Sequence, residues 1–176
     1  DDIDTWLGGN LSVVRVMPNQ PALIDQGISA LFANSVTREN QRDLAESIMS
    51  AVGQVVWLKS ETEMDAVTAV SGTGPAYFYL LIDILIQSAI DFGLDPDTAR
   101  TLAVETARGA TALATAETET MADMINRVRS PGGTTTAAFE YLDKSNARGI
   151  FTDAIEAARQ RAVELGEEAS SNALNR

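Results

Sequence analysis

Cysteine and histidine are both missing from the 176 residues of this chain. Without cysteine there are no disulfides, no thiolate nucleophiles and no cysteine ligands for zinc. Without histidine there is no imidazole to shuttle protons, which excludes every hydrolytic triad that relies on one. Paired carboxylates such as Asp95 with Asp97 lack the glycine spacing of a calcium loop, so we expect no metal site.

Positive charge is scarce, because 13 lysines and arginines stand against 25 aspartates and glutamates, a net charge of −12. Such a surface repels phosphate backbones and anionic membranes, so we expect neither nucleic acid nor a membrane as partner. The opening residues, DDIDTWLGG, lack the apolar run of a signal peptide. The longest apolar stretch, 76–86, contains Asp83 and falls short of the roughly 18 residues of a membrane span. With cysteine absent as well, we expect a cytoplasmic location.

Two compositional halves follow one another along the chain. In the first half, short β-rich runs predict strands at 12–17, 28–33 and 54–58, and helical spacing predicts a helix at 38–52 with Thr37 as its N-cap. In the second half, glycine and proline stops delimit helices at 61–71, 74–93, 96–116, 120–129, 133–143 and 148–169. We therefore predict a mainly α protein, with part of an α/β domain over 1–60 and an all-helical domain over 61–176.

The predicted helix at 74–93 is apolar on almost every side. Between Ala76 and Ile90 only Asp83, Gln87 and Ser88 are polar. A helix of this kind has to be buried nearly all round, which a small helical cluster seldom achieves alone. The next helix carries small residues that permit close approach of a neighbour, namely Ala99, Ala103, Ala107, Gly109, Ala110 and Ala114. We predict an intertwined homodimer, with a monomeric bundle core as the alternative.

A glycine-rich segment, SPGGTT at 130–135, joins two predicted helices. Consecutive glycines let the backbone turn so that unpaired N–H groups at the start of the next helix converge, with the positive end of the helix dipole behind them. This arrangement binds a carboxylate or phosphate without lysine or arginine. The hydroxyls of Ser130, Thr134 and Thr135 add hydrogen-bonding groups. An ordinary helix N-cap after a glycine-rich turn is the alternative.

Two further segments combine glycine or proline with polar residues. The segment VSGTGPAY at 70–77 has neither a third glycine nor a preceding strand, so it is a break between helices and no dinucleotide fingerprint. The segment RVMPNQP at 15–21 follows a predicted strand, and ligands of α/β sheets bind at the carboxyl ends of strands. This loop is therefore expected near a cofactor, although its two prolines also suit a simple rigid turn.

In this order, RVMPNQPAL, AVSGTGPAYFYLL and SPGGTTTAAFEYL resemble the pyrroline-5-carboxylate reductase family. The resemblance covers nearly the whole chain, and three separated motifs agree in order, spacing and type. It implies the remnant of a Rossmann-type domain that binds NADP or NAD, followed by a helical dimerisation domain like the C-terminal domain of 6-phosphogluconate dehydrogenase. It also implies proline biosynthesis, by reduction of 1-pyrroline-5-carboxylate to L-proline with NAD(P)H.

The resemblance further implies that the family's first strand and glycine-rich phosphate loop precede Asp1. We therefore expect a fragment that binds the dinucleotide poorly and has little or no activity alone. Three functional hypotheses stay open. The chain is an oxidoreductase subunit of proline biosynthesis, a non-catalytic helical dimerisation module that lost its nucleotide-binding half, or a relative acting on another imine or on a β-hydroxy acid.

The match to SPGGTT carries over the substrate-binding residues. The resemblance implies that the substrate carboxylate and ring are held by Ser130, Gly132, Gly133, Thr134, Thr135 and Val128. Thr135 matches the threonine whose hydroxyl faces the ring nitrogen, and is the predicted catalytic residue. Because a threonine hydroxyl is a poor acid, we expect it to position the nitrogen and relay a proton rather than act as the primary acid.

The match to RVMPNQP carries over the cofactor-binding residues. The resemblance implies that Met17, Pro18 and Asn19 lie beside the nicotinamide. Arg129 stands where the family usually carries a small or polar residue. We expect its guanidinium to point into solvent, and attraction of an anionic imino acid is the alternative.

Overall fold

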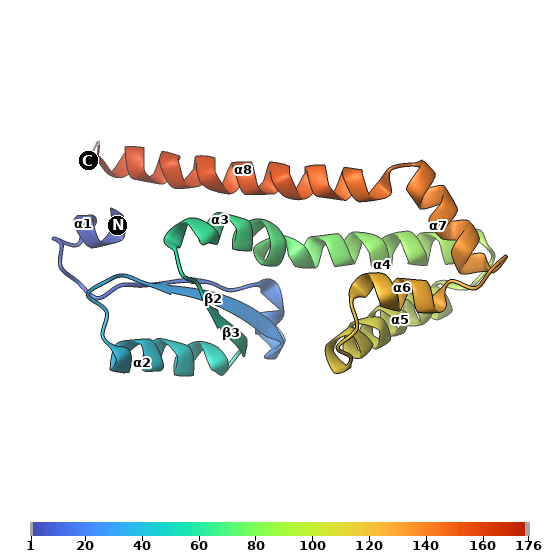
Figure 1. Cartoon of the computed structure of the whole chain (residues 1–176), viewed down its shortest axis with the longest axis horizontal. Helices are drawn as coiled ribbons and strands as arrows, with labels where there is room; N and C mark the ends of the chain where they lie inside the picture. Colours follow the sequence, from blue (N-terminus) through green and yellow to red (C-terminus); the bar gives the residue numbers. More distant parts are fainter. Residues whose placement is uncertain (1, 175–176) are drawn as a thin grey trace. The chain divides into compact units, whose positions relative to one another are not determined.

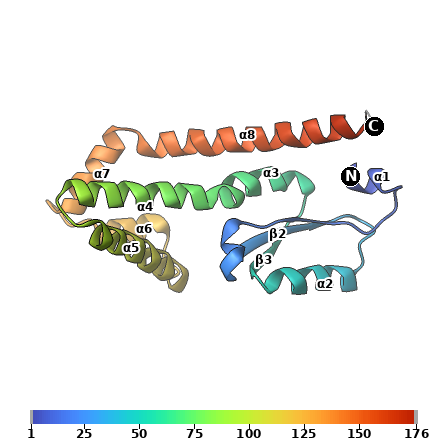
Figure 2. The same cartoon turned by 180° about the vertical axis from the view of Figure 1, so that it is seen from behind.

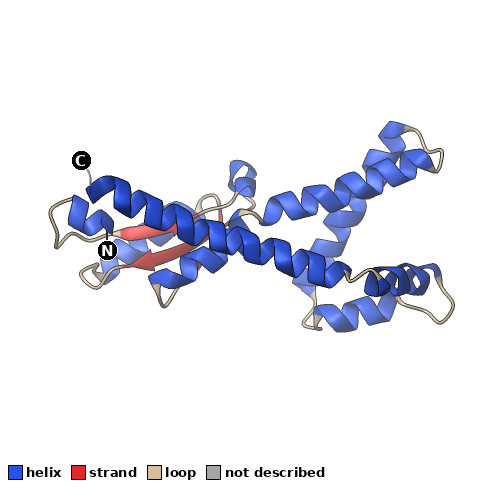
Figure 3. Cartoon of the chain, turned by 90° about the horizontal axis from the view of Figure 1, so that it is seen from above, coloured by secondary structure: helices blue, strands red, loops and turns tan. Residues whose placement is uncertain are grey.

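The computed structural model describes residues 2–174, which are mostly helical with one small sheet (Figures 1 and 3). The chain divides into two compact units. Unit 1 comprises residues 1–75 and 153–176, and unit 2 comprises residues 76–152. The predicted domain boundary near residue 60 stays a prediction.

Three strands form the sheet of unit 1, in the order β1-β2-β3. They are β1 (Val14–Met17), β2 (Gly27–Ala33) and β3 (Gly53–Trp57), which confirms the predicted strands to within two residues. Strand β1 runs antiparallel to β2, with Met17 opposite Ala30. Strand β3 runs parallel to β2, with Val56 opposite Ala30. Leu31 in the middle of β2 is fully buried, so the core of unit 1 lies at this central strand.

Helices cover both faces of this sheet. Helix α2 (Glu39–Ser50) lies along one face (Figures 1 and 2), where the Trp57 indole N–H donates to Glu46 Oε2 at 2.7 Å. On the other face, a cavity of about 250 Å³ separates Ile28, Ala30 and Val56 from the helical residues 66–71. The remaining elements of unit 1 before β3 are α1 (Asp2–Trp6) and η1 (Gln20–Ile24).

The start of α2 differs from the prediction. Arg38 is its N-cap, and its backbone N–H donates to Gln41 Oε1 at 2.9 Å. The predicted cap, Thr37, instead donates its hydroxyl to Asn34 Oδ1 at 2.6 Å and Val13 O at 3.2 Å. The reason is that acceptors at the end of the sheet engage this hydroxyl, so the Gln41 side chain closes the first turn of the helix instead.

One helical run continues from Glu61 to Asp91. It contains η2 (Glu61–Glu63), α3 (Met64–Val67), the π-helical turn η3 (Thr68–Gly72) and α4 (Gly74–Asp91). At the π-turn, the Thr68 carbonyl accepts from both the backbone N–H and the hydroxyl of Thr73, at 2.8 Å and 3.1 Å. The predicted break at the SGTG segment is therefore a widened turn.

This run also corrects the expectation that no apolar stretch is long enough to span a membrane. By length and composition, its 31 residues include a segment long and apolar enough to cross a bilayer, and 11% of that segment is buried. The expectation considered only 76–86, whereas the run also includes apolar residues on both sides of that stretch. A single helix of this kind is weak evidence for a membrane span, because apolar helices at protein interfaces have the same composition.

Unit 2 consists of helices whose bounds lie within two residues of the predicted ones, except that the last helix ends at Leu174 and not at 169. They are α4, α5 (Pro96–Ala116), α6 (Met121–Val128), α7 (Thr134–Lys144) and the start of α8 (Ala147–Leu174). Local caps explain two of the starts. Asp95 Oδ1 accepts from the Thr98 N–H at 3.0 Å, and Thr120 Oγ1 accepts from the Asp123 N–H at 3.2 Å. Ala99 and Ala103 of α5 are buried, as small residues at a helix contact are expected to be.

Much of α4 stays uncovered. Gly74 is its one buried residue, while Phe78 is 55% exposed, Leu81 44% and Leu85 49%. A cavity of about 270 Å³ lies between α4 and α5, lined by both helices. The described part of a single chain therefore does not bury the apolar surface of this helix.

Candidate active site

Two glycines shape the turn between α6 and α7. Gly132 has a φ of 71°, in the left-handed region that glycine adopts without strain. Gly133 is the N-cap of α7 in extended conformation, and its N–H donates to Ser130 O at 2.9 Å. A Cβ atom at Gly133 would overlap Ser130 Oγ. The two consecutive glycines of the motif are thus needed for different reasons: Gly132 because of its positive φ, and Gly133 because Ser130 leaves no room for a side chain.

A threonine without a predicted role, Thr136, closes the turn a second time. Thr136 Oγ1 donates to Ser130 O at 2.7 Å, the same carbonyl that accepts from the Gly133 N–H. Thr136 lies three residues after the N-cap Gly133. That spacing is the usual one for a side chain that folds back on a helix start, and it is the signal that could have found this residue.

The turn leaves a group of donors without partners. The first N–H of α7 that donates within the helix is that of Ala137, to Gly133 O at 3.1 Å. In the part of the chain that the structure describes, the backbone N–H groups of 134–136 meet no acceptor. Nor do the hydroxyls of Ser130, Thr134 and Thr135 take part in any hydrogen bond there. Because the helix dipole adds positive potential at the same place, the turn can hold a carboxylate.

Two residues at the end of α6, Val128 and Arg129, come just before the turn. Val128 ends α6 and is 62% exposed. The Arg129 guanidinium carbon lies 5.1 Å from the centroid of the Phe139 ring. The Arg129 side chain therefore packs on an aromatic ring, and the residue as a whole is half-buried. The physical reason is that a guanidinium is attracted to the face of an aromatic ring, and the turn brings Phe139 within reach.

The predicted cofactor residues belong to unit 1. Met17 ends β1, and Asn19 Oδ1 accepts from the Ile28 N–H at 3.0 Å. Because β1 is antiparallel to β2, this loop lies beside the start of β2 and not beside its carboxyl end. A Cβ atom at Gly72 would overlap Met17 Cε, so the π-turn contacts this loop. No feature of the sequence indicated that contact.

The nine predicted site residues thus form two groups. Val128 and the residues of 130–135 share one turn of unit 2, and residues 17–19 share one loop of unit 1.

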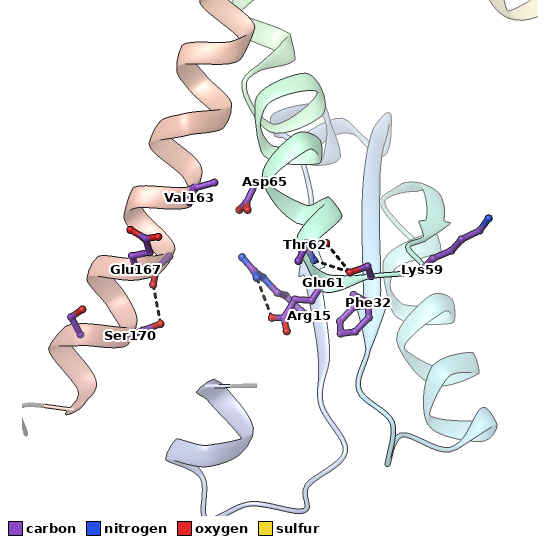
Figure 4. Close-up of a pocket in the computed structure, with 12 residues that line it drawn as sticks. Arg15, Phe32, Lys59, Glu61, Thr62, Asp65, Val163, Glu167 and Ser170 are labelled. Carbon is purple, nitrogen blue, oxygen red and sulfur yellow. Dashed lines mark hydrogen bonds and ion pairs between the residues drawn. The ribbon is translucent and has the colours of Figure 1, made fainter.

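A separate cavity of about 910 Å³ lies in unit 1 and contains none of the predicted site residues (Figure 4). It lies between the carboxyl-terminal part of α8, including Glu167, and the segment around Glu61. Arg15 and Glu61 both line this cavity, and Arg15 Nη1 lies 3.1 Å from Glu61 Oε1. Among the described residues, no three acidic side chains are grouped as a metal ion requires.

Comparison with known proteins gives a consistent result. The family described as "Pyrroline-5-carboxylate reductase dimerisation" matches residues 61–165. The pyrroline-5-carboxylate reductase of Pseudomonas aeruginosa is 42% identical over 166 residues, which are 94% of this chain and 61% of that protein. The one of Synechocystis is 41% identical over 155 residues, 88% of this chain and 58% of that protein.

Solved structures agree with these relatives. A pyrroline-5-carboxylate reductase from Coxiella burnetii superposes with a TM-score of 0.87 at 41% identity, over 93% of this chain and 60% of that one. Plasmodium falciparum pyrroline carboxylate reductase with NADP bound gives a TM-score of 0.84 at 28% identity, over 88% of this chain and 59% of that one.

The chain therefore spans about six tenths of the length of the relatives that it matches. The predicted fold class, mainly α with a small Rossmann-type sheet and a helical dimerisation domain, is confirmed. On the evidence of the family match over 61–165 and of these relatives, the chain belongs to the pyrroline-5-carboxylate reductase family.

Proposed function

We propose that the protein containing this chain reduces 1-pyrroline-5-carboxylate to L-proline with NADPH or NADH. The observation that carries the proposal is the turn before α7, where three backbone N–H groups and three hydroxyls stand without partners. A helix cap needs only one such group. The surplus of donors fits a carboxylate-bearing substrate, and the relatives bear the name of this reaction.

In this proposal the turn holds the carboxylate. The unpartnered N–H groups of Thr134 and Thr135 and the hydroxyl of Ser130 surround it, while Gly132 and Gly133 give the turn its shape. Val128 contacts the ring of the substrate. Since these donors are placed by the backbone, binding requires no side-chain rearrangement, which favours orientation of the bound imine.

Thr135 is the proposed catalytic residue, and its hydroxyl faces the ring nitrogen. The carbon of the C=N bond gains a hydride and the nitrogen ends as an amine, so the protonation of this nitrogen has to be controlled. Thr135 is half-buried and its hydroxyl has no partner in the described part of the chain, so it is available for this contact. Most of the rate enhancement then comes from positioning.

The cofactor residues are proposed from the loop after β1. Bound NAD(P)H supplies the hydride of the reaction. Met17 and Pro18 offer apolar surface for a nicotinamide ring. Asn19 uses its Oδ1 atom for the Ile28 N–H, and its amide N–H groups meet no acceptor among the described residues, so they are left for a carboxamide. These residues fit the nicotinamide end of the cofactor; the choice between NADP and NAD depends on its other end.

The proposed assembly is a homodimer through the helical domain. Its support is the uncovered apolar surface of α4 and the dimerisation family match. We further propose that neither nucleic acid nor a membrane is a partner, because the net charge of −12 repels polyanions. We propose a cytoplasmic location because the chain has no cysteine.

A non-catalytic dimerisation module remains the second candidate. The exposed face of α4 would serve it equally well. The three hydroxyls at the α7 turn favour the enzyme, because a helix cap needs only one of them.

The experiment is a reductase assay on the protein in the length that its gene encodes. Oxidation of NADPH and NADH is followed with 1-pyrroline-5-carboxylate for the wild type, Thr135→Ala and Thr135→Ser. We expect Thr135→Ala to lower kcat/KM by about tenfold or more, and Thr135→Ser to retain most of it. Because the Thr135 hydroxyl makes no hydrogen bond in the described part, the unfolding free energy should change little.

A matched control is Thr111→Ala, which removes a threonine hydroxyl from an exposed position of α5 in the same unit. Its kcat/KM should stay within about twofold of the wild type. A wild type that dimerises but oxidises neither nucleotide would support the dimerisation module instead. Full activity of Thr135→Ala would remove the role assigned to this residue.

A further inference from the structure

We propose that Arg129 makes the site selective for imines that carry a carboxylate. This inference rests on the proposed function, because it concerns the same turn, and it adds a residue that the turn itself does not require. The guanidinium is placed as a fixed cation beside the donors of the turn, where it favours an anionic substrate over a neutral ring of the same shape.

The first step is the position of Arg129. Its guanidinium carbon lies 5.1 Å from the centroid of the Phe139 ring, and the residue as a whole is half-buried. Phe139 lies on α7 four residues after Thr135. Residues four apart share one face of a helix, with Cβ atoms about 5–6 Å apart. Phe139 therefore holds the cation on the face of α7 that carries Thr135.

The second step is that the charge of Arg129 is not neutralised. Among the described residues no carboxylate pairs with it. Arg127, two residues earlier, contrasts with it, since its Nη1 atom lies 2.8 Å from Glu117 Oε2 and 3.1 Å from Glu119 Oε2. The aromatic ring orients the Arg129 guanidinium without cancelling its charge, so that charge remains available to a ligand.

The third step concerns the charge of the whole chain. With a net charge of −12, the surface repels an anionic substrate at long range. The N–H groups of the turn carry only partial charges, and their effect falls off within the first turn of the helix. A half-buried cation is less screened than an exposed one, so Arg129 adds a full positive charge to the partial charges of the donors.

The test compares two substrates that share a ring. Steady-state kinetics are measured for 1-pyrroline-5-carboxylate and for 1-pyrroline, which lacks the carboxylate, with the wild type, Arg129→Gln and Arg129→Lys in the full-length protein. For Arg129→Gln we expect KM for the carboxylate substrate to rise about fivefold or more while kcat changes less than about twofold. The kcat/KM for 1-pyrroline should not change. Arg129→Lys should keep part of the effect, because it keeps the charge and loses the planar stacking.

The control is Arg148→Gln, which removes the same charge from unit 2 at an exposed position after the far end of α7. It should leave both substrates unaffected. An equal loss of kcat/KM for both substrates in Arg129→Gln would indicate damage to the turn and overturn the proposal, as would an unchanged KM. A wild type inactive on both imines would instead overturn the proposed function. Binding of L-proline and of pyrrolidine, measured by calorimetry, would then decide the role of Arg129, since only L-proline should bind more weakly to Arg129→Gln.

Discussion

At the scale of single residues, the carbonyl of Ser130 organises the turn before α7. It accepts from the Gly133 N–H and from the Thr136 hydroxyl, at 2.9 Å and 2.7 Å. Two internal donors directed at one acceptor leave the other N–H groups of the turn pointing outward. Thr136 therefore keeps the turn in shape without contacting the proposed substrate, which makes it a positioning residue.

A substitution at Thr136 tests this positioning. Thr136→Val keeps the size of the side chain and removes a hydrogen bond worth roughly 0.5–1.5 kcal/mol. We expect KM for 1-pyrroline-5-carboxylate to rise about threefold, because the donors are no longer held in one arrangement, while kcat changes less. Thr136→Ser keeps the hydroxyl and should restore the KM of the wild type. Equal KM values for the valine and serine variants would contradict the role of this hydrogen bond.

At the scale of elements, local caps and stops set the helix bounds. Asp95 and Thr120 start α5 and α6 through hydrogen bonds to backbone N–H groups three residues on. Such signals lie within a few residues of each other, so most helices of unit 2 could be predicted from the sequence. The start of α2 could not, because the Thr37 hydroxyl donates to Val13 O, 24 residues earlier in the chain, as well as to the nearby Asn34 Oδ1.

The cap of α5 predicts a dependence of stability on pH. Hydrogen bonds from the Thr98 side chain and backbone N–H lower the pKa of Asp95 below its ordinary value of 3.8. A carboxyl whose pKa is lower in the folded state stabilises the fold above its unfolded pKa, and that contribution is lost as the pH falls through the folded value. The stabilisation from Asp95 is therefore complete at neutral pH and disappears in the acid range below 3.8.

Urea denaturation of the wild type, Asp95→Asn and Asp95→Ala at several pH values checks this dependence. The wild type should be more stable than Asp95→Asn at neutral pH, because only the ionised carboxylate interacts with the positive end of the helix. The difference should shrink as the pH falls below the ordinary pKa. Asp95→Ala should be the least stable of the three at neutral pH, since it has no acceptor. A difference between wild type and Asp95→Asn that does not vary with pH would contradict the assigned pKa direction.

At the scale of the whole molecule, α4 is the helix whose apolar surface a single chain leaves exposed. Phe78, Leu81 and Leu85 follow one stripe of this helix and are each about half exposed. Burying a side chain of this size contributes roughly 1.5–3 kcal/mol. A few such contributions approach the total stability of a domain, about 5–15 kcal/mol. The uncovered stripe thus provides the main driving force for the proposed dimer.

Sedimentation of the protein at micromolar concentration tests the dimer. The wild type should sediment as a dimer or a larger species, and Leu81→Asp should shift it toward the monomer, because a charge in an apolar interface is costly. Gln87→Glu is the control, since it adds a charge of the same sign to the polar stripe that Gln87 shares with Asp83. A well-folded monomeric wild type would contradict the role of α4.

The local features of this protein follow from its sequence. Strand and helix bounds, the shape of the SPGG turn and its outward donors depend on residues within a few positions of one another, where backbone sterics and capping decide. Contacts between distant segments required the folded chain. Examples are the close approach of Met17 Cε to Gly72, the hydrogen bond from the Thr37 hydroxyl to Val13 O and the packing of the Arg129 guanidinium on the Phe139 ring. No local propensity encodes them, because each depends on which of several available partners the packing brings within a few ångströms.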